Sequence, residues 1–182
     1  FRPRVTQVAK RLWGVYVFLT VLLIGLLWIG PMNLYDAVNH ALTAISTGGY
    51  STKNASIAYW HSAYIEYVIT IFMFIGATNI TLIYFCLNGN IKKLFFDEEF
   101  RWFFWFVLIM TGITTGWIMY HGFFTDFPTA FRQAAFQVVT LVSTCGFATE
   151  NYIPWGPFFW MIALILMFIC GCAGSTCGGL KM

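Results

Sequence analysis

The sequence predicts an all-α integral membrane protein made of two tandem repeats, each a membrane span, a short re-entrant helix, a polar loop and a second span. The first observation behind this is composition: 59% of the 182 residues are hydrophobic, only 9% are charged, and mean hydropathy is +0.74. The second is a set of long apolar runs separated by shorter ones. The third is a polar pattern, S-T-x-G-[aromatic]-x-T, that occurs at 46–52 and again at 143–149. Lipid is therefore the solvent for most of this chain.

Four apolar runs cover residues 12–30, 63–87, 101–120 and 155–172. Each is close to the ~20 residues that a spanning helix needs. No small-residue cleavage site follows the first run, so we expect it to stay as a span and not to be removed as a signal peptide.

Two shorter stretches lie between these runs, Leu34 to Ile45 and Pro128 to Val142. Each is too short to cross a bilayer, and each leads directly into one copy of the polar pattern. We call these copies the first signature (46–52) and the second signature (143–149). The order of span, short helix, signature and span therefore occurs twice, which indicates an internal duplication.

Residue pairs separated by 97 positions support the duplication. These pairs are Ala37 and Ala134, Thr43 and Thr140, Ser46 and Ser143, Thr47 and Thr144, Gly49 and Gly146, and Thr52 and Thr149. We therefore divide the chain into a first pore repeat, 1–93, with its filter loop at 46–50, and a second pore repeat, 94–182, with its filter loop at 143–147. In the second repeat the last span is expected to be broken by a glycine-rich loop at 171–179.

The basic residues predict the orientation. Eight of the ten fall before the first span, between the second and third, or after the fourth: Arg2, Arg4, Lys10, Arg11, Lys92, Lys93, Arg101 and Lys181. By the positive-inside rule that face is cytoplasmic. The prediction is a multi-pass protein of the cytoplasmic (inner) membrane, surrounded by lipid, with its N-terminus, central loop and C-terminus in the cytoplasm and both signatures entering from outside.

The signatures have the chemistry of a cation site. Irregular backbone at membrane depth must be buried in protein or line a water-filled path, and the carbonyl end of a short helix carries partial negative charge. Carbonyls arranged this way replace the water around a cation. The candidate filter residues are Ser46, Thr47, Gly48, Gly49 and Tyr50 with Ser143, Thr144, Cys145, Gly146 and Phe147. The alternative for one copy is a simple glycine-capped helix end, which two copies in the same context disfavour.

The glycine-rich loop is the candidate gate. Its residues Gly171, Ala173, Gly174, Ser175, Thr176, Gly178 and Gly179 would interrupt a membrane helix and free backbone groups that need new partners. A broken span beneath a filter is a natural gate. The alternative is close helix packing through small residues.

Other residues carry weaker signals. A structural zinc site needs four ligands. Cys170, Cys172 and Cys177 supply three and have no histidine nearby, so the sequence disfavours a zinc site. No histidine has a second histidine at ligand spacing within its own helix. The protein is therefore not expected to be an enzyme, to carry a cofactor other than a transported ion, or to bind nucleic acid. A membrane-embedded enzyme and a structural membrane module without conduction remain the alternatives.

The signatures also resemble those of a known family. Thr47-Gly48-Gly49-Tyr50 and Thr144-Cys145-Gly146-Phe147 are similar to the T-V-G-Y-G filter of potassium channels, without its last glycine. Such degenerate filters are typical of the Trk/Ktr/HKT superfamily. Residues 41–52 and 138–149 resemble the second and third filter regions of its TrkH-type members, and 171–181 resembles their glycine-rich stretch, with Cys177 where glycine is usual.

This resemblance implies potassium uptake through a filter of four repeats, of which this chain supplies two. Carbonyls of the filter loops, those of Thr47, Gly48, Thr144 and Cys145 among them, would coordinate dehydrated K⁺, and the intramembrane glycine-rich loop would gate. It also implies a homodimer and a cytosolic, TrkA-like nucleotide-binding regulatory subunit. The missing repeats would come from the rest of a longer polypeptide, which we favour, or from a second copy of the chain.

Overall fold

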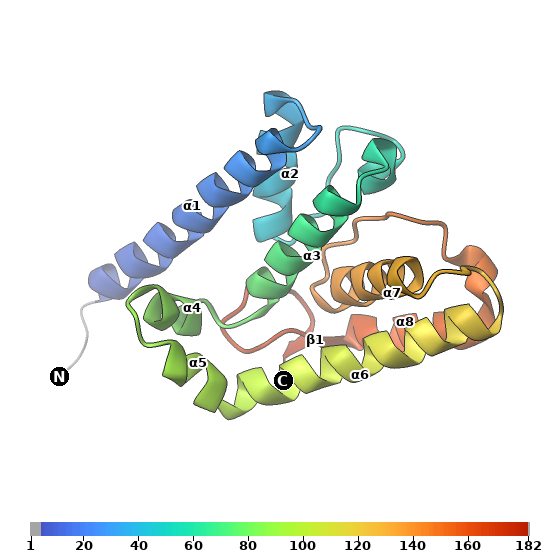
Figure 1. Cartoon of the computed structure of the whole chain (residues 1–182). Helices are drawn as coiled ribbons and strands as arrows, with labels where there is room; N and C mark the ends of the chain where they lie inside the picture. The colour runs from blue at the N-terminus through green and yellow to red at the C-terminus, as the bar shows by residue number, and fades with distance from the viewer. Residues whose placement is uncertain (1–4, 182) are drawn as a thin grey trace.

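The structure is a computed structural model that describes residues 5–181 (Figure 1). The predicted cytoplasmic residues Arg2 and Arg4 lie outside the described residues. In chain order the elements are α1 (Val5–Ile29), α2 (Leu34–Ile45), η1 (Ser56–Trp60), α3 (Ala63–Ala77), α4 (Ile80–Leu87), α5 (Ile91–Phe96), α6 (Glu98–Tyr120), α7 (Phe127–Val142), η2 (Ile153–Trp155), α8 (Gly156–Phe168), β1 (Ile169–Cys170) and β2 (Leu180–Lys181).

The two short helices lie where the sequence places them. Helix α2 has the expected bounds, and α7 begins one residue early, at Phe127. At the start of α2, the Asn33 side chain accepts a hydrogen bond of 2.7 Å from the backbone N–H of Asp36, which satisfies a free helix-start donor. Helix α7 has Pro128 in its first turn, where the missing N–H costs nothing.

The second predicted span is not one helix. Helices α3 and α4 meet at an angle of 109°, with Thr78 and Asn79 between them. The Thr78 hydroxyl donates to the Ile75 carbonyl at 2.6 Å, and the Asn79 side chain accepts from the backbone N–H of Thr81 at 2.9 Å. These local bonds compete with helix continuation. The expectation of a single straight helix over 63–87 was therefore wrong.

Helix α8 ends at Phe168, before the glycine-rich loop. Helix α8 has 13 residues, about 20 Å at 1.5 Å per residue, which is short of a hydrocarbon core of about 30 Å. The chain then enters β1, which pairs in parallel with β2 through the partners Ile169 with Leu180 and Cys170 with Lys181. This two-residue ladder closes the glycine-rich loop at its base and is the one departure from the all-α prediction in residues 5–181.

Helix α1 packs beside α2 and α3, while α7 lies between α3 and α6 (Figure 1). On α2, the buried face consists largely of small residues, Ala37, Ala41 and Ala44, which let neighbouring backbones approach closely. Large apolar side chains such as Trp102, Trp105 and Leu164 are exposed on the outer faces.

Two helices are individually long and apolar enough to cross a bilayer, at Ala9–Ile29 and Glu98–Tyr120, and the bent α3–α4 pair is a third candidate. Exposed apolar faces of this kind suit lipid. The predicted class, an all-α membrane protein, is confirmed.

The tight fit of the glycine-rich loop against α3 gives a stability prediction. A Cβ added at Gly171 would lie 2.4 Å from the Ala77 carbonyl oxygen, whereas one added at Gly112 in α6 would have no atom within 4 Å. We expect Gly171→Ala to destabilise the protein by about 1–3 kcal/mol, and Gly112→Ala to be neutral or slightly stabilising. Thermal unfolding in detergent tests this, and equal midpoints for the two variants would contradict it.

Candidate functional site

The two signatures share one backbone structure. In each, a threonine carbonyl in the last turn of the preceding helix accepts two backbone N–H groups from the loop. The Thr43 carbonyl accepts from Gly48 at 2.7 Å and Gly49 at 3.3 Å, and the Thr140 carbonyl accepts from Cys145 at 3.1 Å and Gly146 at 3.3 Å. The same threonines donate their hydroxyls to the loop, Thr43 to the Tyr50 carbonyl at 2.9 Å and Thr140 to the Phe147 carbonyl at 3.1 Å. The pattern read from the sequence is thus repeated in the hydrogen bonds.

Backbone angles repeat as well. Thr47 and Thr144 both have a φ of 53°, and Gly49 and Gly146 have φ values of 65° and 87°. Threonine is β-branched and rarely adopts positive φ, so the same unusual angle at both threonines marks a constrained segment. Residues alternating between positive and negative φ turn their carbonyls away from the regular helical direction.

A second pair of bonds holds the far end of each signature. The Thr52 hydroxyl donates to Asp36 Oδ1, and the Thr149 hydroxyl donates to Gln133 Oε1, both at 2.6 Å. Asp36 and Gln133 are themselves 97 positions apart, so the brace belongs to the repeat although its chemistry differs. Sequence reasoning missed this pair because the two side chains are not alike. The 97-residue offset was the signal that could have found it.

Each brace is backed by an ion pair. Lys53 Nζ lies 3.8 Å from Asp36 Oδ2 in the first repeat. In the second, Gln133 Nε2 donates to Glu66 Oε2 at 3.1 Å, and Arg132 Nε lies 2.7 Å from the same oxygen. Glu66 is buried, with 6% of its surface exposed. Because Glu66 belongs to α3 and Arg132 to α7, this ion pair connects a helix of the first repeat to a helix of the second.

The aromatic residues of the two signatures have different surroundings. Phe147 is 1% exposed and stacks on His40 of α2, with ring centroids 5.8 Å apart. His40 also hydrogen-bonds the Ser51 hydroxyl at 2.9 Å. The second signature therefore packs on the pore helix of the first repeat. Tyr50, its equivalent, is 78% exposed, so the two rings of the repeat are not equivalently covered in this chain.

The two signatures also touch directly. A Cβ built on Gly49 would lie 1.8 Å from the Cys145 carbonyl oxygen, so only glycine fits there. Gly146 has no atom within 4 Å of such a Cβ. The structure thus brings together candidate filter residues that are about 100 positions apart in the sequence.

The glycine-rich loop bonds to both signatures. The Thr47 hydroxyl donates to the Thr176 carbonyl at 3.1 Å, and the backbone N–H of Gly178 donates to the Thr144 hydroxyl at 3.1 Å. The Thr176 hydroxyl lies within hydrogen-bond distance of the Ile45 and Gly76 carbonyls. The candidate gate residues therefore lie against the candidate filter residues, through the two threonines at positive φ.

The rest of the loop is held by α3, α4 and α6. The backbone N–H groups of Cys172 and Thr176 donate to the Ala77 and Gly76 carbonyls at 2.9 and 3.2 Å. The carboxylate of Glu99, in the first turn of α6, accepts from the backbone N–H of Ala173. At the other end, Lys181 Nζ donates to the Ser175 carbonyl at 2.9 Å.

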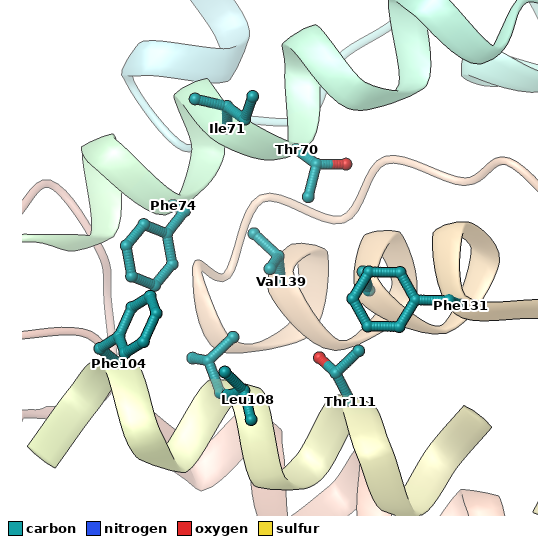
Figure 2. Close-up of a pocket in the computed structure, with 10 residues that line it drawn as sticks. Thr70, Ile71, Phe74, Phe104, Leu108, Thr111, Phe131 and Val139 are labelled. Carbon is teal, nitrogen blue, oxygen red and sulfur yellow. The ribbon is translucent and has the colours of Figure 1, made fainter. Parts of the chain in front are cut away.

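A separate hollow of about 370 Å³ lies between α3, α6 and α7 (Figure 2). Figure 2 shows Phe74, Phe104, Phe131 and Val139 pointing into it, with Thr70 among the few polar groups. The Thr70 hydroxyl already donates to the Glu66 carbonyl at 2.6 Å. This hollow offers a cation almost no oxygen ligands. Residues 5–181 also contain no group of three or more His, Cys, Asp or Glu side chains that could hold a metal ion.

Short helices that end in polar loops between apolar membrane helices are an arrangement found in the class of membrane transport proteins. The chain belongs to the TrkH family, described as cation transport proteins, whose family model matches residues 2–182.

Relatives agree with this assignment. The chain is 40% identical over 182 residues to the Trk system potassium uptake protein TrkH of Salmonella typhimurium, 39% identical to that of Escherichia coli K12, and 33% identical to TrkG of the same strain. It also matches the crystal structure of the potassium transporter TrkH from Vibrio parahaemolyticus, with a TM-score of 0.93, 34% identity, all of this chain and 39% of that chain. The chain spans about 38% of the length of the TrkH relatives from Salmonella and E. coli.

The two ion pairs give a matched prediction. Arg132→Gln leaves the Glu66 carboxylate buried without its cation, which we expect to cost about 3 kcal/mol. Lys53→Gln removes a partly exposed cation 3.8 Å from the buried Asp36 carboxylate, which keeps the hydrogen bond from the Thr52 hydroxyl. We therefore expect a smaller cost, about 1 kcal/mol. Thermal unfolding in detergent measures both. If Lys53→Gln lowered the free energy of unfolding more than Arg132→Gln did, the Glu66–Arg132 pair would not be the more important of the two ion pairs.

Proposed function

We propose that this chain forms part of a pathway for potassium uptake across the cytoplasmic membrane, supplying two of the four repeats of a central filter. The observation that carries the proposal is the repeated geometry of the signatures, with the same hydrogen bonds to Thr43 and Thr140 and the same positive φ at Thr47 and Thr144. The names of the relatives, potassium uptake proteins and not enzymes, supply the ion.

In this proposal the backbone carbonyls of the signatures, among them those of Thr47, Gly48, Thr144 and Cys145, coordinate K⁺ as it loses its water. Close carbonyl dipoles replace the hydration shell. Helices α2 and α7 end at the signatures, so that their partial negative ends favour a cation there. Thr43 and Thr140 hold the loops in shape, which lowers the cost of keeping several carbonyls together.

The exposed ring of Tyr50 supports the presence of further repeats around the filter. Phe147 of the second signature is covered by His40 on the pore helix of the preceding repeat. By the same rule, Tyr50 would be covered by the pore helix of a repeat that precedes the first. We therefore infer that other repeats complete the ring. We favour repeats of the same longer polypeptide over a second copy of this chain.

The glycine-rich loop is the proposed gate. Its contacts with Thr47 and Thr144 support a position directly against the filter, on the side where the pore helices end. The Glu99 carboxylate, at the start of α6, accepts a hydrogen bond from the Ala173 N–H of the glycine-rich loop. This bond connects the loop to α6 and to α5, which directly precedes α6 in the chain. A cytosolic nucleotide-binding, TrkA-like regulatory subunit and a homodimer complete the proposal, and both rest on the family resemblance.

Orientation is also a proposal. Of the described basic residues on which the prediction rests, Lys181 belongs to β2. Lys10, Arg11, Lys92, Lys93 and Arg101 belong to α1, α5 or the start of α6, at one end of the molecule (Figure 1). By the positive-inside rule this end is cytoplasmic, and the signatures open toward the outer face.

The filter assignment is tested by a matched pair of glycines. Gly146 and Gly122 both have positive φ, 87° and 69°, and both have no atom within 4 Å of an added Cβ. Alanine at either site carries similar local strain, about 1–2 kcal/mol. In the complete gene product, we expect Gly146→Ala to reduce rubidium uptake and potassium-dependent growth by tenfold or more, because the strain falls on the coordinating backbone. Gly122→Ala, in the outer loop, is expected to transport normally.

Protein levels in the membrane are measured for both variants so that uptake is compared per molecule. If Gly146→Ala transported potassium as well as Gly122→Ala, the second signature would not be a filter. A structural membrane module would then explain the chain better.

The gate assignment is tested at the start of α6. Glu99→Gln weakens the bond to the Ala173 N–H, since a neutral amide oxygen is a poorer acceptor than a carboxylate. We expect a looser glycine-rich loop and faster rubidium uptake at unchanged selectivity. Glu98→Gln is the control. Glu98 is exposed, and its substitution removes the same charge one residue away from Glu99. Faster uptake in both variants would assign the effect to surface charge and not to the loop.

A further inference from the structure

Two adjoining hollows lie between α1 and α4, and no signature residue lines either of them. One, of about 270 Å³, is lined by Arg11, Gly14, Phe18 and Leu87 among others. The second, of about 180 Å³, is lined by Leu12, Thr81 and Phe85. Arg11 and Tyr84 line both. In Figure 1 this region is where the first turns of α1 approach α4.

The hollows are positively charged. The Arg11 guanidinium lies 5.6 Å from the centroid of the Tyr84 ring, and Lys93 Nζ lies 4.2 Å from that of Phe85. Lys10 lines the larger hollow. The two ion pairs found among the described residues involve Lys53 and Arg132. These three cations therefore have no carboxylate partner within that part of the chain, and their field attracts an anion.

The floor of the larger hollow is apolar. A single face of α1 forms this floor, where Gly14, Val15 and Phe18 follow Arg11 at helical spacing. The ligand that fills this shape must combine an anionic group with a hydrocarbon chain.

The neighbouring helices suit the membrane interface. Helices α4 and α5 contain no buried residue, and their exposed side chains include Leu87, Ile91 and Phe95. Trp13, one residue from Gly14, is 70% exposed, and tryptophan favours the headgroup level. An acidic protein segment would satisfy the cations but would leave these apolar side chains facing water. A lipid satisfies both.

We propose that this hollow binds one anionic phospholipid. Arg11 and Lys10 bind the headgroup phosphate, Lys93, over the Phe85 ring of the smaller hollow, adds to the positive field, and one acyl chain lies along Gly14 and Phe18. The site is independent of the signatures and of the ion they coordinate. Basic pockets between membrane helices recognise lipid headgroups by this chemistry.

The test is native mass spectrometry of the complete gene product in detergent, titrated with phosphatidylglycerol or phosphatidylcholine. We expect preferential retention of phosphatidylglycerol. Arg11→Gln should weaken it about fivefold, the effect of one basic residue near an anionic lipid. Gly14→Leu tests shape without changing charge, because a Cβ at Gly14 has no neighbour within 4 Å and the new side chain would fill the hollow. It should weaken retention at least as much.

Two controls match these variants. Lys92→Gln removes an equal charge beside Lys93 but lines neither hollow, and Gly25→Leu adds the same side chain on α1 at another open site. Both should retain the lipid normally.

Equal retention of the two lipids, or equal loss with Arg11→Gln and Lys92→Gln, would overturn the proposal in favour of general surface charge. Undiminished retention in both Arg11→Gln and Gly14→Leu would also overturn it, and would leave the basic cluster to an acidic protein partner. Inorganic phosphate is the competitor that separates a lipid from a free anion. Displacement of the lipid by phosphate alone would assign the hollow to a free anion.

Discussion

The rest of this structure depends on one constraint, that a backbone carbonyl or N–H group at membrane depth must find its partner inside the protein. The chain breaks regular structure repeatedly within its apolar segments, and the broken ends supply one another. Where α3 stops, the carbonyls of Gly76 and Ala77 accept from Thr176 and Cys172 of the glycine-rich loop. The bend in one span and the break in another are thus two halves of one hydrogen-bonded arrangement.

The same constraint explains the threonines of the signatures. Thr43 and Thr140 each accept two loop N–H groups and donate one hydroxyl, which closes the loop on its own helix end. Thr47 and Thr144 then connect the loops to the glycine-rich loop. A hydroxyl is small and both donates and accepts, so that threonine joins irregular segments without adding charge to a low-dielectric region.

Duplication preserved geometry more strictly than chemistry. Asp36 and Gln133 hold the signature ends at the same distance, although one is an acid with a lysine partner and the other an amide backed by an ion pair. The glycines differ as well, since Gly49 is pressed against Cys145 while Gly146 is open. The two repeats do not have equivalent neighbours in this chain, and they diverge where one repeat meets the other.

The sequence by itself determined the membrane class, the two short helices, the position of both signatures and the broken last span. These follow from composition, run length, the 97-residue repeat and glycine content, which are local quantities. It did not determine the bend at Thr78 and Asn79, which lie inside an unbroken apolar run, because the bonds that Gly76 and Ala77 make with the glycine-rich loop form across about 100 residues. Nor did it determine the Glu66–Arg132 pair, the stacking of Phe147 on His40 or the exposure of Tyr50. Only the tertiary structure decides these, because a contact between elements depends on which helices become neighbours, and local sequence carries no record of that.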